Sequence, residues 1–286
     1  MVGPASEVMA QNLADRCGML RAMPASTDTD PAVFDQHLAS WREWQASPWG
    51  RLRYAVVGHV LDTHLASMGT GLRVLDLGGG DGTESLRLAA LGHDVTLVDP
   101  SEGMLGVARA QADAAGLADR VVTVHAGVDD LARLGLGSFD VVLFHFVIHY
   151  LADPAAAVAA AAGHVGPGGF LSLMAPNPDA DVLVRVRDLD LAGARDLLAS
   201  GTRESVTFAH SMTHVGVEQA RAMLGATALQ EVGHYGQRGL MNMVASNEPK
   251  HDPEFYAELE RLEIELCGTT PYRDIGSSWQ LVARRP

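Results

Sequence analysis

Cysteine is scarce in this sequence, which holds only Cys17 and Cys267 among its 286 residues. Two cysteines so far apart in the chain give neither a metal-ligand spacing nor a disulfide framework, and such usage is typical of the reducing cytoplasm. No apolar run approaches the roughly 18 residues that span a membrane. The N-terminus also lacks a basic region followed by an apolar core, which is the pattern of a secretory signal. We therefore expect a cytoplasmic protein that does not associate with membranes.

Positive charge is also scarce. Lys and Arg together number 21 against 35 Asp and Glu, so the formal net charge is −14. This excess of negative charge disfavours broad, non-specific binding to nucleic acid, although it leaves room for a local basic patch. The shares of hydrophobic (47%) and charged (20%) residues are those of a soluble globular protein. The length allows one large α/β domain with insertions, or one domain with a small cap.

The most informative stretch of the chain is residues 73–99, which has the order strand, glycine turn, helix, strand. Residues 73–77 and 95–98 are apolar runs with branched side chains, fit for buried parallel strands. Leucines and alanines recur among polar residues at 83–91, so a helix follows the turn directly. The turn holds glycines that let the backbone bend tightly and approach a ligand with no Cβ in the way: Gly78, Gly79, Gly80 and Gly82.

Acidic residues around this turn indicate the kind of cofactor. Asp99 ends the second strand, where a carboxylate can accept hydrogen bonds from both hydroxyls of a ribose. Asp76 before the turn and Asp81 inside it would repel the pyrophosphate of a dinucleotide, which normally sits on the helix N-terminus. Two carboxylates suit a cofactor that carries cations, such as the ammonium and sulfonium of S-adenosyl-L-methionine. We therefore predict S-adenosylmethionine, with Asp76, Gly78, Gly79, Gly80 and Asp99 among the residues that bind it.

Strands and helices continue to alternate after this unit. The pattern predicts helices at 102–115 and 153–165 and strands at 121–125, 139–145 and 168–174, followed by a helix at 253–267 between late strands at 228–246 and 277–283. This pace indicates an α/β fold. We expect a Rossmann-like, seven-stranded, mostly parallel sheet with helices on both faces, plus N-terminal helices and an inserted helical cap.

Three regions follow from this pattern. Residues 1–30 show no sustained period and are read as a flexible N-terminal arm. Residues 31–70 are predicted to form a helical lid, with tryptophans at 41, 44 and 49 and a helix over 51–68. The tryptophans suit either core packing or an aromatic lid over cofactor or substrate. The main domain is predicted at 71–286, with the cap inserted at about 177–225, mostly helical.

Further polar residues follow the third and fourth strands, at the sheet edge where ligands bind in such folds. A backbone N–H at Val128 and the carboxylate of Asp129 are candidates for contact with the edge of an adenine; the alternative for the aspartate is the N-cap of a short helix. His145 lies where the fourth strand ends, and His149 or Tyr150 could act there as a general base, unless it is a structural residue. The twelve histidines offer no ligand pair with an obvious third partner, so we expect no metal.

Together these residues resemble the class I S-adenosylmethionine-dependent methyltransferases. From about residue 34 to the C-terminus the chain resembles, more specifically, the tRNA 5-carboxymethoxyuridine methyltransferases, which methylate the carboxylate of a modified wobble uridine. The matching segments are VLDLGGGDG, FDVVLFHFVIHYLADP, GPGGFLSLMAPN and YAELERLEIELCGTTPYRDIG…LVARRP. The last segment is not a generic cofactor motif.

The resemblance implies roles for individual residues. It assigns Arg53 to the cofactor's carboxylate, Asp99 to its ribose and His145 to a place near the transferring end. It also places Gly78 and Gly79 at the methionine part and Val128 and Asp129 at the adenine. Arg238 falls where a guanidinium could hold an acceptor carboxylate, and Trp49 is a second candidate for contact with the substrate.

One departure from this family bears on the substrate. Where the tRNA enzymes have a lysine-rich run in the cap, residues 197–210 hold one arginine, one glutamate and no lysine. Because phosphate contacts supply most of the affinity for nucleic acid, we expect a small-molecule methyl acceptor, and tRNA as the alternative. A non-catalytic homologue that binds the cofactor is a second alternative, and assembly as a homodimer is left open.

Overall fold

The computed structural model describes residues 38–200, 202–204 and 211–286. The predicted arm at 1–30 and the first part of the predicted lid lie outside the described residues. Within the described part of the chain, no helix is long and apolar enough to cross a membrane.

Seven strands form the main sheet, in the order β3-β2-β1-β4-β5-β9-β8. Their bounds are β1 Arg73–Leu77, β2 Asp94–Asp99, β3 Val121–His125, β4 Phe139–His145, β5 Val165–Pro176, β8 Gln230–Gln237 and β9 Ser278–Arg284. Strand β9 is antiparallel to both of its neighbours, and the other pairs are parallel. The predicted seven-stranded, mostly parallel sheet is confirmed. The chain order reverses direction beside β1, which is where ligands bind in sheets of this kind.

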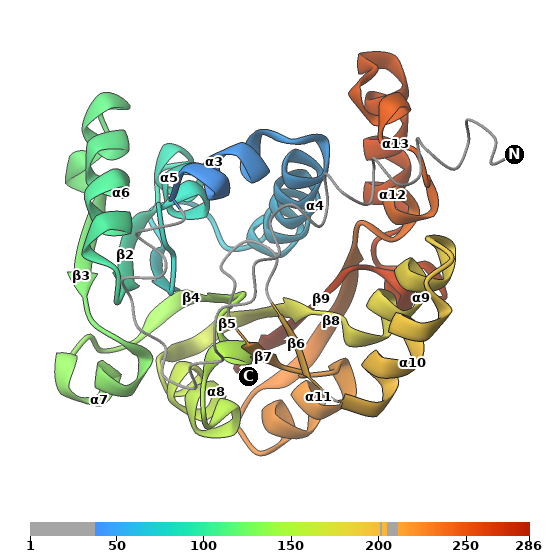
Figure 1. Ribbon diagram of the computed structural model, residues 1–286. Coiled ribbons are helices and arrows are strands. Elements are labelled where there is room, and N and C mark those ends of the chain that lie inside the picture. Colours follow the sequence, from blue (N-terminus) through green and yellow to red (C-terminus); the bar gives the residue numbers. More distant parts are fainter. Residues whose placement is uncertain (1–37, 201, 205–210) are drawn as a thin grey trace, which may run out of the picture.

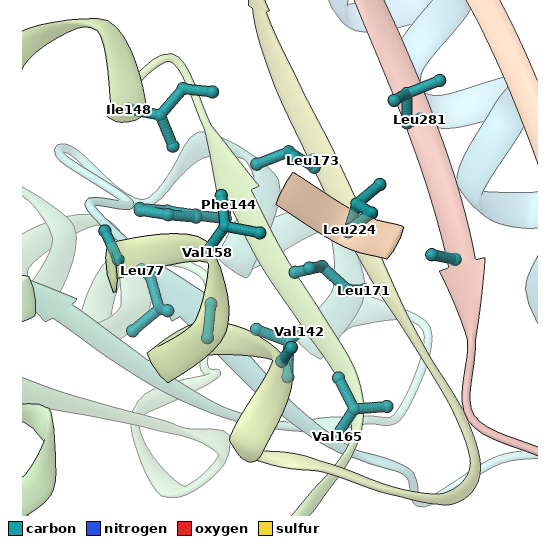
Figure 2. Close-up of a cluster of buried hydrophobic side chains, with 14 of the residues drawn as sticks. Leu77, Val142, Phe144, Ile148, Val158, Val165, Leu171, Leu173, Leu224 and Leu281 are labelled. Atoms are coloured by element: carbon teal, nitrogen blue, oxygen red, sulfur yellow. The ribbon is translucent and has the colours of Figure 1, made fainter. Parts of the chain in front are cut away.

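Helices cover both faces of the sheet (Figure 1). One face packs against α4 (Pro48–Leu65), α5 (Thr83–Ala90), α6 (Glu102–Ala114) and α13 (Pro253–Leu266), and the other against α8 (Pro154–Gly163) and α11 (Val217–Gly225). Figure 2 shows the second of these cores, where Phe144, Leu171 and Leu281 from three strands meet Val158 and Leu224 from the helices. Burial of branched apolar strand residues on both faces explains why strands β1, β2 and β4 read as nearly continuous apolar runs.

Four helices begin with the same pair of residues, a capping side chain followed by a proline, and this pair can be read in the sequence. In each, a Ser, Asp or Asn side chain accepts a backbone N–H of the first turn, and a Pro follows at once: Ser47-Pro48, Asp153-Pro154, Asn177-Pro178 and Asp252-Pro253. The cap satisfies one of the unpaired N–H groups, and the Pro has no N–H to leave unpaired.

The segment after β5 forms α9 (Pro178–Arg187), α10 (Leu191–Ser200), the two-stranded pair β6 (Thr202–Glu204) and β7 (Ser211–Thr213), and then α11. The remaining α-helices of the described residues are α3 (Leu38–Ala46), α7 (Leu131–Leu134) and α12 (Gly239–Met243). The prediction that 177–224 is mostly helical did not include the β6–β7 pair.

The prediction of a strand over 228–246 was wrong beyond Gln237. Arg238 adopts a left-handed backbone conformation with φ of 61°, which ends β8 and starts α12. The N–H of Met241 in that helix donates to Glu263 of α13 at 2.7 Å. A buried carboxylate on another helix thus caps α12, and a partner so far away in the sequence left no local signal.

Candidate cofactor and acceptor site

The glycine turn between β1 and α5 requires glycine for two different reasons. Gly78 and Gly80 have positive φ angles of 69° and 56°, a conformation that side chains disfavour. A Cβ on Gly79 would lie 2.6 Å from Oδ2 of Asp76, and one on Gly78 would lie 2.3 Å from the side chain of Val147. The N–H of Gly78 donates to the carbonyl of Val98 at 2.7 Å, which joins the turn to β2.

Asp99, at the end of β2, is held by the backbone on both oxygens. Its Oδ2 accepts from the N–H of Gly80 at 2.9 Å, and its Oδ1 accepts from the N–H of Ser101 at 2.8 Å. These two contacts orient the carboxylate at the end of β2. Its role at the ribose of the cofactor stays a prediction.

Asp76 is buried directly beneath the turn. Burial, followed by the neighbouring charge of Glu84, raises the pKa of Asp76 to about 7, although Ser85 Oγ donates to its Oδ2 at 2.6 Å. The structure therefore holds a carboxylate whose ionisation is costly unless a cation comes close.

Asp81, the second acid of the turn, has a different surrounding. Its Oδ1 accepts from Thr83 Oγ1 at 3.0 Å and from Gln45 Nε2 at 3.3 Å. Gln45 also donates to Tyr54 Oη at 2.9 Å. Asp81 thereby ties α3 and α4 to the start of α5.

Glu84, one turn into α5, pairs with His145 at the end of β4. The two side chains are 2.6 Å apart between Nδ1 and Oε2, and both are largely buried. Burial is the largest single influence and raises the pKa of Glu84, but the contact with His145 and the guanidiniums of Arg53 and Arg87 outweigh it, so the net pKa is lowered. Sequence reasoning placed His145 here and missed Glu84.

Arg53 is buried inside a cage of aromatic rings on α3, α4 and the end of β4. Its Cζ lies 4.3 Å from the ring centroid of Tyr54, 4.6 Å from Trp44, 4.7 Å from Phe146 and 5.3 Å from Trp41. Phe146 reaches this place with a positive φ of 57°, unusual for a bulky residue. The rings fix the cation by cation–π contact, and two of the three predicted lid tryptophans belong to the cage.

Arg238 also lies near Trp44. Its Cζ is 5.9 Å from that ring, and its NH2 donates to Ser277 Oγ at 3.1 Å. The indole of Trp44 is therefore shared by two guanidiniums, Arg53 and Arg238. Trp49 does not join them: it packs against the core beneath α4 and meets His251 edge-on at 6.2 Å.

The other predicted residues follow β3 and β4. Val128 and Asp129 lie in a short 3₁₀ helix, Val128–Asp130, in which Asp130 rather than Asp129 accepts the N–H of Gly127 at 3.3 Å. His149 is buried, with its ring 4.2 Å from that of Tyr150. Roles for these four residues stay predictions. Among the described residues, no group of three or more His, Cys, Asp or Glu side chains is arranged to hold a metal ion.

Comparison with known proteins decides the family. The family described as "Methyltransferase domain" matches residues 75–173. The tRNA 5-carboxymethoxyuridine methyltransferase of Escherichia coli (strain K12) is 31% identical over 239 residues, which are 83% of this chain and 89% of that protein. The chain belongs to the S-adenosylmethionine-dependent methyltransferases.

Solved structures of other methyltransferases share the fold. The N-methyltransferase NodS from Bradyrhizobium japonicum has a TM-score of 0.57 at 17% identity, with 91% of this chain and 100% of that chain covered. Magnesium protoporphyrin IX methyltransferase from Synechocystis PCC 6803 has a TM-score of 0.58 at 18% identity, with 88% and 95% covered. Both crystal structures contain S-adenosylhomocysteine, the product form of the cofactor. The predicted cofactor is thus supported.

The residues of this methyltransferase fit S-adenosylmethionine. Nε of Arg53 is buried and has no hydrogen-bond partner within the described ranges, so the cofactor's carboxylate would supply one. A cation beside Asp76 would offset the cost of ionising that carboxyl, and Asp99, the predicted ribose ligand, is held in place by two backbone N–H groups. Among these groups, Arg53 came from the family resemblance alone. Its cage is assembled from four separate positions, which no local sequence pattern reveals.

Proposed function

We propose that this methyltransferase transfers the methyl group of S-adenosylmethionine to a carboxylate of a small organic molecule. The observation that carries the proposal is Arg238, whose guanidinium lies beside the same indole as that of Arg53. Arg53 fits the cofactor's carboxylate, and Arg238 fits that of the acceptor, since a guanidinium binds carboxylates in bidentate fashion.

The charge of the cap supports a small acceptor. Arg185 of α9 pairs with Asp190 at 2.6 Å, and Arg187 pairs with Asp188 at 2.7 Å. Guanidiniums already paired with carboxylates contribute little to phosphate binding, which needs cations that can replace counterions. Together with the formal net charge of −14, this pairing favours a small molecule over tRNA.

The chain's own residues would act chiefly by placement. When bound, the cofactor supplies a methyl group already activated by the positive charge of its sulfonium. Arg238 would orient an acceptor oxygen, and the rings of Trp44 and Phe146 would exclude water. A carboxylate acceptor carries no proton to remove, so His149 and Tyr150 would line the site without acting as a base. An acceptor hydroxyl or amine would instead need one of them.

The second candidate function is methylation of the carboxyl group of a wobble uridine in tRNA. It is favoured by the 31% identity to the E. coli tRNA enzyme over most of both chains. The bacterial relative acts on tRNA by its name, and the same chemistry would use Arg238 in the same way.

One experiment distinguishes the two candidate functions. The purified protein is incubated with methyl-labelled S-adenosylmethionine and either a panel of small carboxylic acids or bulk tRNA whose modified wobble uridine carries an unmethylated carboxyl group. Label in a small molecule that is released as methanol by mild base supports the proposal, because esters are base-labile. Label only in tRNA would replace it with the second candidate. Base-stable label in a small molecule would show transfer to nitrogen, carbon or an ether oxygen, and would refute the carboxylate acceptor.

A further inference from the structure

A chain of six polar side chains crosses the buried interior beneath α4. It begins at Glu84 on α5, passes through His145 at the end of β4 and Ser172 on β5, and continues through Gln280, Gln237 and Ser278 on β9 and β8. The successive distances are 2.6, 2.8, 2.9, 2.8 and 2.8 Å. It therefore runs from the glycine turn to the residues next to Ser277 and Arg238.

The middle of this chain is fully buried. Ser172, Gln237 and Gln280 have no exposed surface, and the same sheet face carries Phe170, Met174 and Val282. Polar groups in such a place are destabilising unless every donor and acceptor is matched. Apolar side chains would fill these positions at less cost, so their polarity has some other role than stability.

The hydrogen bonds all run in one direction. Ser278 Oγ donates to Gln237 Oε1, Gln237 Nε2 donates to Gln280 Oε1, and Gln280 Nε2 donates to Ser172 Oγ. Ser172 Oγ accepts from Gln280, and among the described residues its own proton has no acceptor other than Nε2 of His145, 2.8 Å away. Nε2 is then an acceptor, and the ring proton lies on Nδ1, which donates to Glu84.

The reverse direction is also self-consistent, but it requires a different charge. If both glutamine amides turned over, Ser172 would donate to Gln280 and accept from Nε2. His145 would then donate from both nitrogens and be a cation. The orientation of the two amides is thus linked to the charge of His145.

The charged groups around His145 are on three other elements. Glu84 on α5 is in contact with Nδ1, and Glu84 in turn interacts electrostatically with Asp76 at β1 and with Arg53 on α4. With a neutral imidazole, the carboxylate of Glu84 keeps its full negative charge on the cofactor side of the ring. If His145 were an imidazolium, its positive charge would neutralise the negative charge of Glu84.

We propose that Ser172, Gln280 and Gln237 are positioning residues that hold His145 as a neutral imidazole with its proton on Nδ1, so that the negative charge of Glu84 faces the cationic end of the cofactor. His145 is then not the base of the reaction, because Nε2 is occupied by Ser172. The inference rests on the assignment of the cofactor site and not on the identity of the acceptor.

The test begins with the wild-type protein. Nitrogen NMR of ¹⁵N-histidine-labelled protein distinguishes the two neutral tautomers and the cation, and the signals of His145 are those lost in His145→Gln. At pH 7.5 we expect a protonated Nδ1 and an unprotonated Nε2. A proton on both nitrogens, or on Nε2 alone, would overturn the proposal whatever acceptor the enzyme uses.

A matched pair of variants tests the link to the cofactor. Gln280→Glu replaces the donor to Ser172 by a carboxylate oxygen that can only accept. Ser172 would then donate to position 280 and accept from Nε2 of His145, which favours the imidazolium. Gln230→Glu makes the same change at an exposed position of β8. In Gln280→Glu we expect both ring nitrogens protonated and a loss of S-adenosylmethionine affinity of about threefold or more relative to neutral-sulfur S-adenosylhomocysteine, by calorimetry. Equal losses for the two ligands would contradict the electrostatic role. Should Gln280→Glu fail to fold, the wild-type tautomer decides alone.

Discussion

Replacing Asp76 by Asn should raise the free energy of unfolding of the cofactor-free protein and lower its affinity for S-adenosylmethionine. The carboxyl of Asp76 is buried, and its pKa is raised to about 7 by burial and by the charge of Glu84. Asn has nearly the same shape and its Oδ1 can still accept from Ser85. The variant therefore removes a costly ionisation and keeps the packing.

The sign and size follow from proton linkage. A carboxyl whose pKa is raised on folding binds a proton in the folded state that the unfolded chain has already released. Stability is then highest at acidic pH and falls as pH rises from about 4 to about 7. Each unit of difference between the folded and unfolded pKa of Asp76 corresponds to about 1.4 kcal/mol, so ionisation of this carboxyl lowers the free energy of unfolding by at most about 4 kcal/mol. Relaxation of the buried site would reduce it, and we expect about 1–3 kcal/mol.

The assay is the free energy of unfolding in urea at pH 5.5 and pH 8, without cofactor. The difference in stability between Asp76→Asn and the wild type should increase in favour of the variant as pH rises. Asp113→Asn, an exposed acid on α6, is the control and should follow the wild type. Saturating S-adenosylmethionine should reverse the order, since a bound ligand stabilises by its affinity and Asp76 contributes to that affinity. Parallel stability curves for Asp76→Asn and the wild type across this range would refute the reasoning.

Four other substitutions each test the role of one residue of the site. Arg53→Gln should weaken S-adenosylmethionine binding by about tenfold to a hundredfold in calorimetry, the value of a charged hydrogen bond, whereas Arg51→Gln two positions away should not. Asp99→Ala should weaken the same binding by about tenfold or more, and unchanged affinity would contradict its ribose role. Gly79→Ala should cost about 1–3 kcal/mol in thermal unfolding, because its Cβ would overlap the Asp76 carboxylate. Arg238→Gln should raise KM for the acceptor about tenfold and leave the cofactor's dissociation constant unchanged; equal effects on both would place Arg238 at the cofactor.

Much of the sheet and several residues of the cofactor site could be predicted from the sequence, because the patterns that indicate them lie within short segments of the chain. The bounds of β1, β3 and β4 follow from apolar runs between turn residues, and the glycine turn with Asp99 follows from one stretch of 27 residues, 73–99. The end of β8 could not be predicted, because Glu263 of α13 is what caps α12 there. The cage around Arg53 and the chain from Glu84 to Ser278 are equally invisible locally, since each is assembled from separate elements.

The sulfonium cofactor was inferred from two acids of the glycine turn, but the structure uses them unequally. Asp81 is occupied by Gln45 and Thr83 and serves to attach α3. Its place as the second carboxylate near Asp76 is taken by Glu84, whose charge is one reason that the pKa of Asp76 is raised. Burial and the charge of Glu84 both make the ionisation of Asp76 costly, and a cation near Asp76 would offset that cost. The same cost therefore favours a cationic cofactor over a pyrophosphate.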